Sequence, residues 1–354
     1  MKRRIFIFGF AVLLLLQGCS TALLNREYVT EQTHEENSLL TDASILRADS
    51  YDSLVSAILQ LVGQRVEHGV IRLYNYSGDV GEDLSNACLE VKQNNPLGAY
   101  AVDYITHDFS RIVSYYEVNL YIAYRRSYEQ IKSVVAATGS SAIEKVLQNA
   151  LEQFSPAAVL RIGYFEEDEA YIRTILSQAY DATPNAAFGL PDCEIGLYPE
   201  EGTERILEIT LTYQRDQEVL LRQQEQVERV ADSLTASTAG ESQKDTLTQL
   251  YRKLKQSTVC DTEGKETVYA ALIQGRANSE GVAMAVSLLC KTAEIPCELV
   301  RGTRNGAARV WNRVTLDGEV LELDVAAQLQ AGGETPTYMP QGGMGGAYGY
   351  QTAD

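Results

Sequence analysis

An internal repeat constrains the fold of this chain more than any other feature of its sequence. Matching segments lie 89 residues apart, and no gap is needed to align them: Ile71-Arg72-Leu73 recurs as Leu160-Arg161-Ile162, and Tyr124-Arg125-Arg126 recurs as Tyr213-Gln214-Arg215. The apolar positions before the first match recur as well, with Leu54, Ile58 and Val62 falling on Ile143, Leu147 and Leu151. A repeat of this kind predicts two copies of one small unit that pack against each other.

The hydrophobic spacing predicts the elements of each copy. In the first copy, Leu54, Ile58, Leu61 and Val62 keep helical spacing. A strand is expected at 70–76 and a helix at 81–93, ended by Asn94-Asn95-Pro96. Strands are expected at 99–105 and 115–124, joined by a turn that contains His107. Two such units form one α+β domain over residues 46–234, which ends before the small, polar stretch 235–240.

The N-terminus carries the pattern of an export signal. Three cations, Lys2, Arg3 and Arg4, precede an apolar run at 5–16, and Leu16-Gln17-Gly18-Cys19 resembles a lipobox. The alternatives are an ordinary cleaved signal or a single membrane-spanning helix. The apolar run is short for a membrane span, and an ordinary signal gives no reason for Gly-Cys at its end. We therefore expect residues 1–18 to be a signal peptide and Cys19 to carry palmitate or similar acyl chains, which anchor the protein to the extracytoplasmic face of the cell membrane.

Both ends of the mature chain are predicted to be unstructured. Residues 19–45 are largely polar and acidic, and we expect them to form a flexible tether between lipid and fold. Residues 331–354 are rich in Gly and Tyr and show no hydrophobic period, so a disordered tail is expected there.

Composition excludes several kinds of partner. The net charge of −18 repels phosphate backbones, so no nucleic acid is expected. Besides Cys19 the chain has five cysteines without regular spacing, which argues against a disulfide framework. CxxC pairs are absent and only three histidines are present, so we expect no metal and no cofactor.

A series of segments near the C-terminus carries a family resemblance. In order they are Leu250-Tyr-Arg-Lys-Leu254, Thr267-Val-Tyr-Ala-Ala-Leu272, Gly275-Arg-Ala-Asn-Ser-Glu-Gly281, Glu294-Ile-Pro-Cys-Glu-Leu-Val300, Arg309-Val-Trp-Asn312 and Leu323-Asp-Val325. Together they resemble the transglutaminase-like family of the papain-like cysteine enzymes. The resemblance implies a transglutaminase-like domain at 241–330, following the tandem repeat domain in an α+β chain.

The resemblance also implies where catalytic residues would lie. In the family a cysteine opens the catalytic helix, a histidine acts as base, and an aspartate orients the histidine. The matching positions here hold Ser279, Arg309 and Asp324. Arginine stays protonated at any working pH and cannot act as a base. The three histidines, at 34, 68 and 107, all lie outside this domain. The domain is therefore predicted to be a pseudoenzyme.

The dipeptide Asp317-Gly318 predicts the register of a hairpin in this domain. It is a type I′ turn signal, and it pairs Leu316 with Glu319 and makes Arg309 a diagonal neighbour of Asp324. One face of the hairpin is then polar and carries Arg309, Trp311, Arg313, Glu322 and Asp324, with Trp311 opposite Asp324. We expect an Arg309–Asp324 pair near the start of a helix capped by the Ser279 hydroxyl. The residues of a candidate groove are Asn278, Trp311, Arg313 and Glu322.

Three functions fit these features. The first is a tethered lipoprotein whose non-catalytic domain binds or scaffolds a peptide, a protein or peptidoglycan. The second is an active protease, amidase or transglutaminase that uses Ser279 or borrows His107. The third is a structural spacer.

Overall fold

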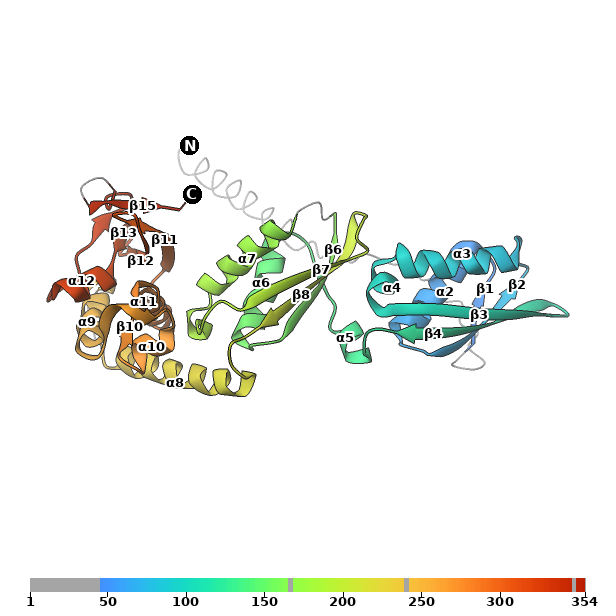
Figure 1. Ribbon diagram of the computed structural model, residues 1–354, viewed down its shortest axis with the longest axis horizontal. Coiled ribbons are helices and arrows are strands. Elements are labelled where there is room, and N and C mark those ends of the chain that lie inside the picture. Colours follow the sequence, from blue (N-terminus) through green and yellow to red (C-terminus); the bar gives the residue numbers. More distant parts are fainter. Residues whose placement is uncertain (1–44, 165–167, 239–241, 346–347, 354) are drawn as a thin grey trace, which may run out of the picture. The chain divides into compact units, whose positions relative to one another are not determined.

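The computed structural model describes residues 45–164, 168–238, 242–345 and 348–353. The predicted signal peptide, Cys19 and the predicted tether up to residue 44 lie outside these residues. The fold is α+β, as predicted (Figure 1). In the described part of the chain, no helix has both the length and the apolar character needed to cross a membrane.

The first unit is a four-stranded sheet with helices packed on it. Its elements are β1 (Ile45–Ala48), α2 (Tyr51–Gly63), β2 (His68–Tyr74), α3 (Val80–Gln93), α4 (Pro96–Ala101), β3 (Val102–Ile112) and β4 (Tyr115–Tyr124). The strand order is β1-β2-β4-β3, with β1 parallel to β2 and the other pairs antiparallel. Alternate residues of β2 and β4, such as Ile71 and Val118, share one hydrophobic core with Leu54 and Ile58 of α2. The helical spacing read from the sequence thus marks the side of α2 that faces the core.

The second unit has the same strand order as the first. After α5 (Tyr128–Lys132) come β5 (Val135–Ala137), α6 (Ser140–Glu152), β6 (Ala157–Gly163), α7 (Glu169–Asp181), the 3₁₀ turn η1 (Pro184–Ala186), β7 (Asp192–Tyr198) and β8 (Glu204–Thr212). The strand order is β5-β6-β8-β7, again with the first pair parallel and the others antiparallel.

Finer details of the backbone also recur at the spacing of the repeat. Arg72 lies opposite Glu117 in the first unit, and Arg161 lies opposite Ile206 in the second. Four residues with positive φ form two pairs at the same spacing, Arg65 with Phe154 and Asn75 with Tyr164. Residues other than glycine rarely adopt a positive φ. Its recurrence in residues of different type shows that the backbone follows the same path in the corresponding turns of the two units.

Three expectations for these units were wrong. The short strands β1 and β5 were not predicted, because strands of four and three residues give too few positions for a period. The predicted strand at 99–105 begins instead as helix α4, because Asn95 accepts hydrogen bonds from the N–H groups of Leu97 and Gly98 and Pro96 suits the first helical position. His107 lies within β3 rather than in a turn.

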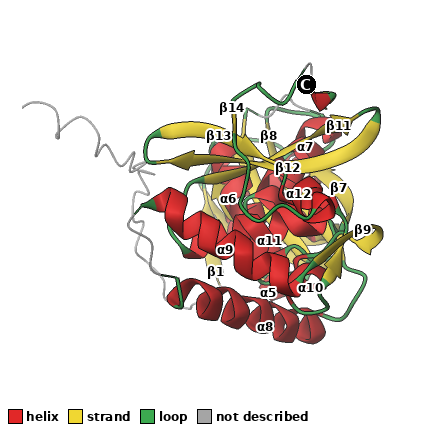
Figure 2. Cartoon of the chain, turned by 90° about the vertical axis from the view of Figure 1, so that its left-hand side faces the viewer, coloured by secondary structure: helices red, strands yellow, loops and turns green. Residues whose placement is uncertain are grey.

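The C-terminal domain is built around a buried helix. A long helix, α8 (Gln217–Ala236), leads into α9 (Gln243–Ser257), β9 (Val259–Lys265), α10 (Val268–Leu272), β10 (Arg276–Ala277), α11 (Ser279–Thr292), β11 (Cys297–Arg304), β12 (Ala307–Leu316), β13 (Glu319–Leu323), α12 (Val325–Ala331), β14 (Met339–Pro340) and β15 (Tyr350–Thr352). Every residue of α11 from 281 to 290 is buried. The sheet β14-β13-β12-β11-β15 lies beside this helix (Figure 2). A helix buried all round marks the centre of a domain.

The second unit and the C-terminal domain share one hydrophobic core. Leu147 and Tyr180 of the second unit belong to the same buried cluster as Val286 and Leu323 of the C-terminal domain. The start of α11 is also tied to α7, because Arg301 of β11 donates hydrogen bonds both to Glu280 of α11 and to Asp181 of α7. The predicted boundary at 235–240 therefore separates two sequence patterns but does not interrupt the core.

The expectation of a disordered tail at 331–354 was wrong for its described part. β15 pairs with β11, with Gly302 opposite Thr352, and β14 pairs with β13. Met344 and Tyr350 are buried against Val300 and Trp311. The tail has no hydrophobic period because two very short strands joined by glycine turns need only single apolar residues to attach it. We call residues 332–345 and 348–353 the C-terminal segment.

Candidate functional site

Arg309 and Asp324 form a buried ion pair at the position where family chemistry would lie. Arg309 projects from β12, and its Nε and Nη2 donate to the two oxygens of Asp324 at 2.6 and 2.8 Å. The side chains are only 10% and 3% exposed. Two parallel charge-assisted hydrogen bonds fix both the spacing and the orientation of the groups. The hairpin that brings them together has the predicted register, with Leu316 opposite Glu319.

Asp324 receives further hydrogen bonds that were not predicted. The Tyr350 hydroxyl donates to its Oδ2 at 2.7 Å, and the Ala327 N–H donates to its Oδ1 at 2.8 Å. The expected strand position of Asp324, opposite Trp311, was wrong: pairing ends with Asn312 opposite Leu323, and Asp324 is the N-cap of α12. The backbone turns away there because the carboxylate accepts a helical N–H. Both carboxylate oxygens are thus occupied by donors.

The charge states follow from this geometry. Burial alone would lower the pKa of Arg309, but the hydrogen bonds to Asp324 outweigh it and the pKa is raised. The pKa of Tyr350 is raised as well, first by burial and then by its hydrogen bond to Asp324. The cluster therefore holds a fixed cation and a neutral phenol, and neither of these groups can act as a base at neutral pH.

The candidate groove over Trp311, Arg313 and Glu322 is closed. Trp311 is 1% exposed and its ring lies 5.2 Å from that of Tyr350. Glu322 is also buried and pairs with Arg313 at 3.0 Å. The expectation of an accessible polar face was wrong because the C-terminal segment covers it.

Ser279 begins α11, but it does not cap the helix. The N-cap is Asn278, whose Oδ1 accepts from the N–H groups of Glu280 and Gly281 at 3.0 and 3.1 Å. The expected cap by the Ser279 hydroxyl was wrong, because asparagine is at least as good a cap and lies one residue earlier. No hydrogen bond joins the Ser279 hydroxyl to another described residue. Neither His68 nor His107 is near it in the chain, since both lie in strands of the first unit.

Cys260 is the thiol beside the Arg309–Asp324 pair, and sequence reasoning gave it no role at this site. It lies on β9, where Arg309 and Asp324 both influence its charge. Burial raises the pKa of the thiol, and the nearby Arg309 only partly opposes this effect. Cys260 is thus held as the neutral thiol, which is the unreactive form.

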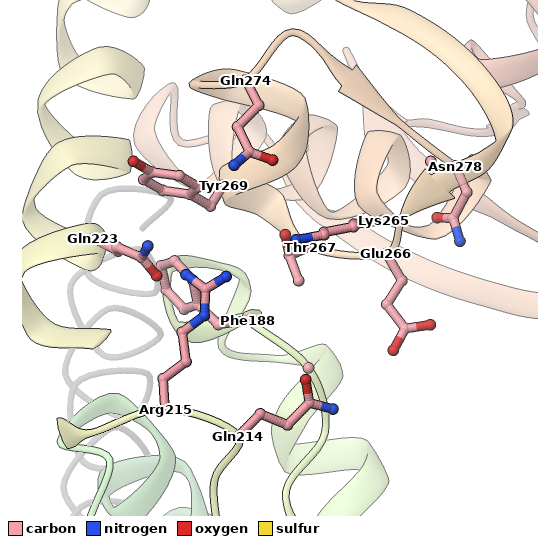
Figure 3. A pocket seen from close by; sticks show the side chains of 12 residues that line it. Phe188, Gln214, Arg215, Gln223, Lys265, Glu266, Thr267, Tyr269, Gln274 and Asn278 are labelled. Atoms are coloured by element: carbon pink, nitrogen blue, oxygen red, sulfur yellow. The ribbon is translucent and has the colours of Figure 1, made fainter. Parts of the chain in front are cut away.

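A cavity of about 260 Å³ opens beside the start of α11, between the second unit and the C-terminal domain (Figure 3). Of the four residues predicted to form a groove, only Asn278 lines this cavity. Its lining residues are Phe188, Gly189, Gln214, Arg215, Gln223, Gly264, Lys265, Glu266, Thr267, Tyr269, Gln274 and Asn278. They come from three separate stretches of the chain, which is why sequence reasoning missed them. Within the described ranges, no group of His, Cys, Asp and Glu side chains is arranged to hold a metal ion.

Comparison with known proteins gives distant structural similarity alone. No known family profile matches the chain, and no curated protein matches it. Among solved structures it is similar to a TGase, with a TM-score of 0.27 and 12% identity over 48% of this chain and 50% of the other. It is also similar to a candidate cysteine protease of Cytophaga hutchinsonii, with a TM-score of 0.26 and 7% identity over 46% and 71% of the two chains.

A candidate protease of Parabacteroides distasonis has a TM-score of 0.22 and 8% identity, over 77% of this chain and 44% of the other. The chain thus spans about half the length of the TGase. At TM-scores this low the likeness carries no argument about chemistry, so the site has to be judged from its own geometry.

Proposed function

We propose that this chain is a lipid-anchored, extracytoplasmic binding protein whose transglutaminase-like domain is not catalytic. The observation that carries the proposal is the Arg309–Asp324 pair. A general base must be able to lose and regain a proton near neutral pH, and a guanidinium held by a carboxylate does neither. Because Tyr350 and the C-terminal segment seal the pair, water and substrate are also kept from the carboxylate.

The alternative, an active protease, amidase or transglutaminase, has little support. No described histidine or carboxylate forms a hydrogen bond with the Ser279 hydroxyl. His107 lies in β3, where its Nε2 is 3.4 Å from the hydroxyl of the exposed Ser85. A serine hydroxyl without a base is a poor nucleophile.

Catalysis is tested with the detergent-solubilised full-length protein and peptide substrates for hydrolysis, deamidation and acyl transfer. We expect no turnover above that of a Ser279→Ala variant. Turnover that disappears in Ser279→Ala, with the fold intact by circular dichroism, would overturn the proposal. As a comparison, Ser279→Cys with Arg309→His installs nucleophile and base together, and neither change alone should give activity, because the two groups act as a unit.

The anchor is tested separately. If Cys19 carries acyl chains, Cys19→Ser should abolish incorporation of labelled palmitate and release the protein from the membrane fraction. If the variant kept both the palmitate label and its membrane association, the proposed anchor at Cys19 would be wrong. The conclusion about catalysis would not change.

A further inference from the structure

The repeat places two comparable arginines at two junctions, and only one of them has a partner. At the first junction Arg126, which follows β4, pairs with Glu208 of the second unit and donates to the Tyr198 hydroxyl at 3.1 Å. Its guanidinium also lies 4.9 Å from the ring centre of Tyr100. Tyr100 is completely buried. The first junction is thus filled by an aromatic ring and neutralised by a carboxylate.

The second junction lacks both of these groups. Arg215 follows β8 at the position equivalent to Arg126, and Gly189 stands where the repeat has Tyr100. Arg215 makes no ion pair or hydrogen bond with any described side chain, and it lines the cavity together with Gly189. The cavity therefore lies at the junction where the ring and the acid are missing.

A second unpaired cation lies on the opposite wall. Lys265, at the end of β9, lines the same cavity and its ammonium has no partner among the described residues. In Figure 3 Lys265 extends toward Arg215, whereas Glu266 extends in another direction. The chain as a whole has 48 acidic and 30 basic residues, so two free cations at one cavity favour an anionic ligand.

One residue of the cavity wall, Gln223, has an acceptor atom that lacks a donor. Gln223 Oε1 of α8 is buried and has no hydrogen-bond partner among the described groups. A buried acceptor left without a donor destabilises the protein. When the Gln223 amide rotates toward the cavity, a ligand that bears an N–H close to its negative charge satisfies this acceptor and the two cations together.

The aromatic walls and the size of the cavity further restrict the kind of ligand that can bind. Phe188 and Tyr269 give two aromatic surfaces, with ring centres 6.3 Å apart. At about 260 Å³ the cavity is smaller than the roughly 300–1,000 Å³ of pockets that enclose a drug-sized molecule. It can take the last residue of a chain, but it cannot enclose a whole peptide.

We propose that this cavity binds the free C-terminal residue of a peptide, with the carboxylate between Arg215 and Lys265 and the terminal amide N–H on Gln223. The inference rests on the proposed binding function and names the ligand class for it. A peptide C-terminus is the group that joins a carboxylate, a neighbouring N–H and an apolar side chain in one residue. At this second junction the carboxylate of the ligand pairs with Arg215, as the carboxylate of Glu208 pairs with Arg126 at the first junction.

Calorimetric titration of the detergent-solubilised full-length protein tests the proposal. The probes are N-acetyl-alanyl-leucine, its C-terminal carboxamide, and inorganic phosphate. We expect the free acid to bind, and the carboxamide to bind at least about tenfold more weakly, because it lacks the charge that Arg215 and Lys265 recognise. Phosphate should also bind more weakly, since it has no N–H and no apolar group.

Variants assign the binding to the cavity. Arg215→Gln should lower the affinity for the free acid by about tenfold or more. Gln223→Leu should lower the affinity for the acid and for the carboxamide alike, because both ligands carry the N–H. Arg222→Gln is the matched control: Arg222 lies on the same helix as Gln223, is exposed and does not line the cavity. Circular dichroism melting shows that each variant is folded.

Four results would overturn the proposal: no binding at millimolar acid, equal binding of acid and carboxamide, phosphate binding as tight as that of the acid, or wild-type affinity in Arg215→Gln. None of them bears on catalysis, which is tested by turnover in Ser279→Ala. A failure here is therefore distinguishable from a failure of the proposed function.

Discussion

Arg309 and Arg215 are two arginines in very different surroundings. Arg309 lies on β12 of the C-terminal domain, and Arg215 lies between the second unit and that domain. Arg309 is buried and donates two hydrogen bonds to Asp324, which also accepts from Tyr350 of the C-terminal segment. Arg215 is exposed on the wall of a cavity and has no acidic partner. The first arginine stabilises the fold and is closed to ligands, whereas the second contributes little to the fold and remains free to bind.

If the proposals are correct, the position that resembles a catalytic site and the site that binds a ligand are different places in this protein. The position that the family resemblance points to is filled by the protein's own groups. The cavity proposed to bind a ligand lies instead at a junction between the second unit and the C-terminal domain, and Asn278 is one of its lining residues. Four substitutions test this contrast, from the largest expected effect to the smallest.

Asp324→Asn should destabilise the protein most. Asparagine keeps one acceptor oxygen, which can still cap α12, but its NH2 group cannot accept from Tyr350 and it leaves the buried Arg309 without a counter-charge. Removing one member of a buried pair costs about 3–5 kcal/mol of unfolding free energy, measured by urea denaturation. Glu204→Gln, which breaks the exposed pair with Arg161, should stay within about 1 kcal/mol. Equal losses in the two variants would show that Arg309 is not buried in solution.

Glu208→Gln, at the first junction, should have the next largest effect. The carboxylate is 14% exposed and accepts from both Arg126 and the Tyr198 hydroxyl. Hydrogen bonds to charged groups contribute about 1.5–3 kcal/mol each, so we expect a loss in that range in the same assay. A loss below that of Glu204→Gln would contradict the view that the first junction is held by its ion pair.

Tyr350→Phe should cost about 1–2 kcal/mol and also change the response to alkaline pH. Because the pKa of Tyr350 is raised in the folded protein, its hydroxyl contributes stability that is fully present below the unfolded pKa of about 10. That contribution is lost as pH rises through the folded pKa. Urea denaturation at rising pH above 10 should therefore bring wild type and variant closer together. A constant difference would contradict the assignment.

Arg215→Gln should have the smallest effect on stability. An exposed side chain without partners changes the unfolding free energy by less than about 0.5 kcal/mol, even though the same variant is expected to lose ligand affinity. A large loss of stability with no change in affinity would reverse the contrast between the two arginines.

Local signals account for what could be predicted from the sequence. The dipeptide Asp317-Gly318 defines a turn in which both residues have positive φ, and the pairing of Leu316 with Glu319 and of Arg313 with Glu322 follows from it. The 89-residue spacing likewise depends on patterns that each unit carries within itself. Ser279 was misjudged as a cap because two good capping residues are adjacent there.

Non-local pairing accounts for what was missed. The C-terminal segment attaches through β15, which pairs with a strand about fifty residues earlier in the sequence. No hydrophobic period within the segment predicts this pairing. The cavity depends on residues near 188, 215 and 265, which meet only after the units have packed. One signal was nevertheless present in the sequence: the repeat replaces Tyr100 by Gly189 while keeping the arginine.

The position of Trp311 gives this protein a built-in optical probe. It is the chain's single tryptophan, and it lies beneath Tyr350 with its indole N–H buried and without a hydrogen-bond partner. When β15 leaves the sheet, water reaches the indole and its emission shifts to longer wavelength, even if every other element stays folded. Circular dichroism averages over all helices and strands, whereas this emission reports one contact. Release of the C-terminal segment can therefore be timed separately from unfolding, without a label and without altering the sequence.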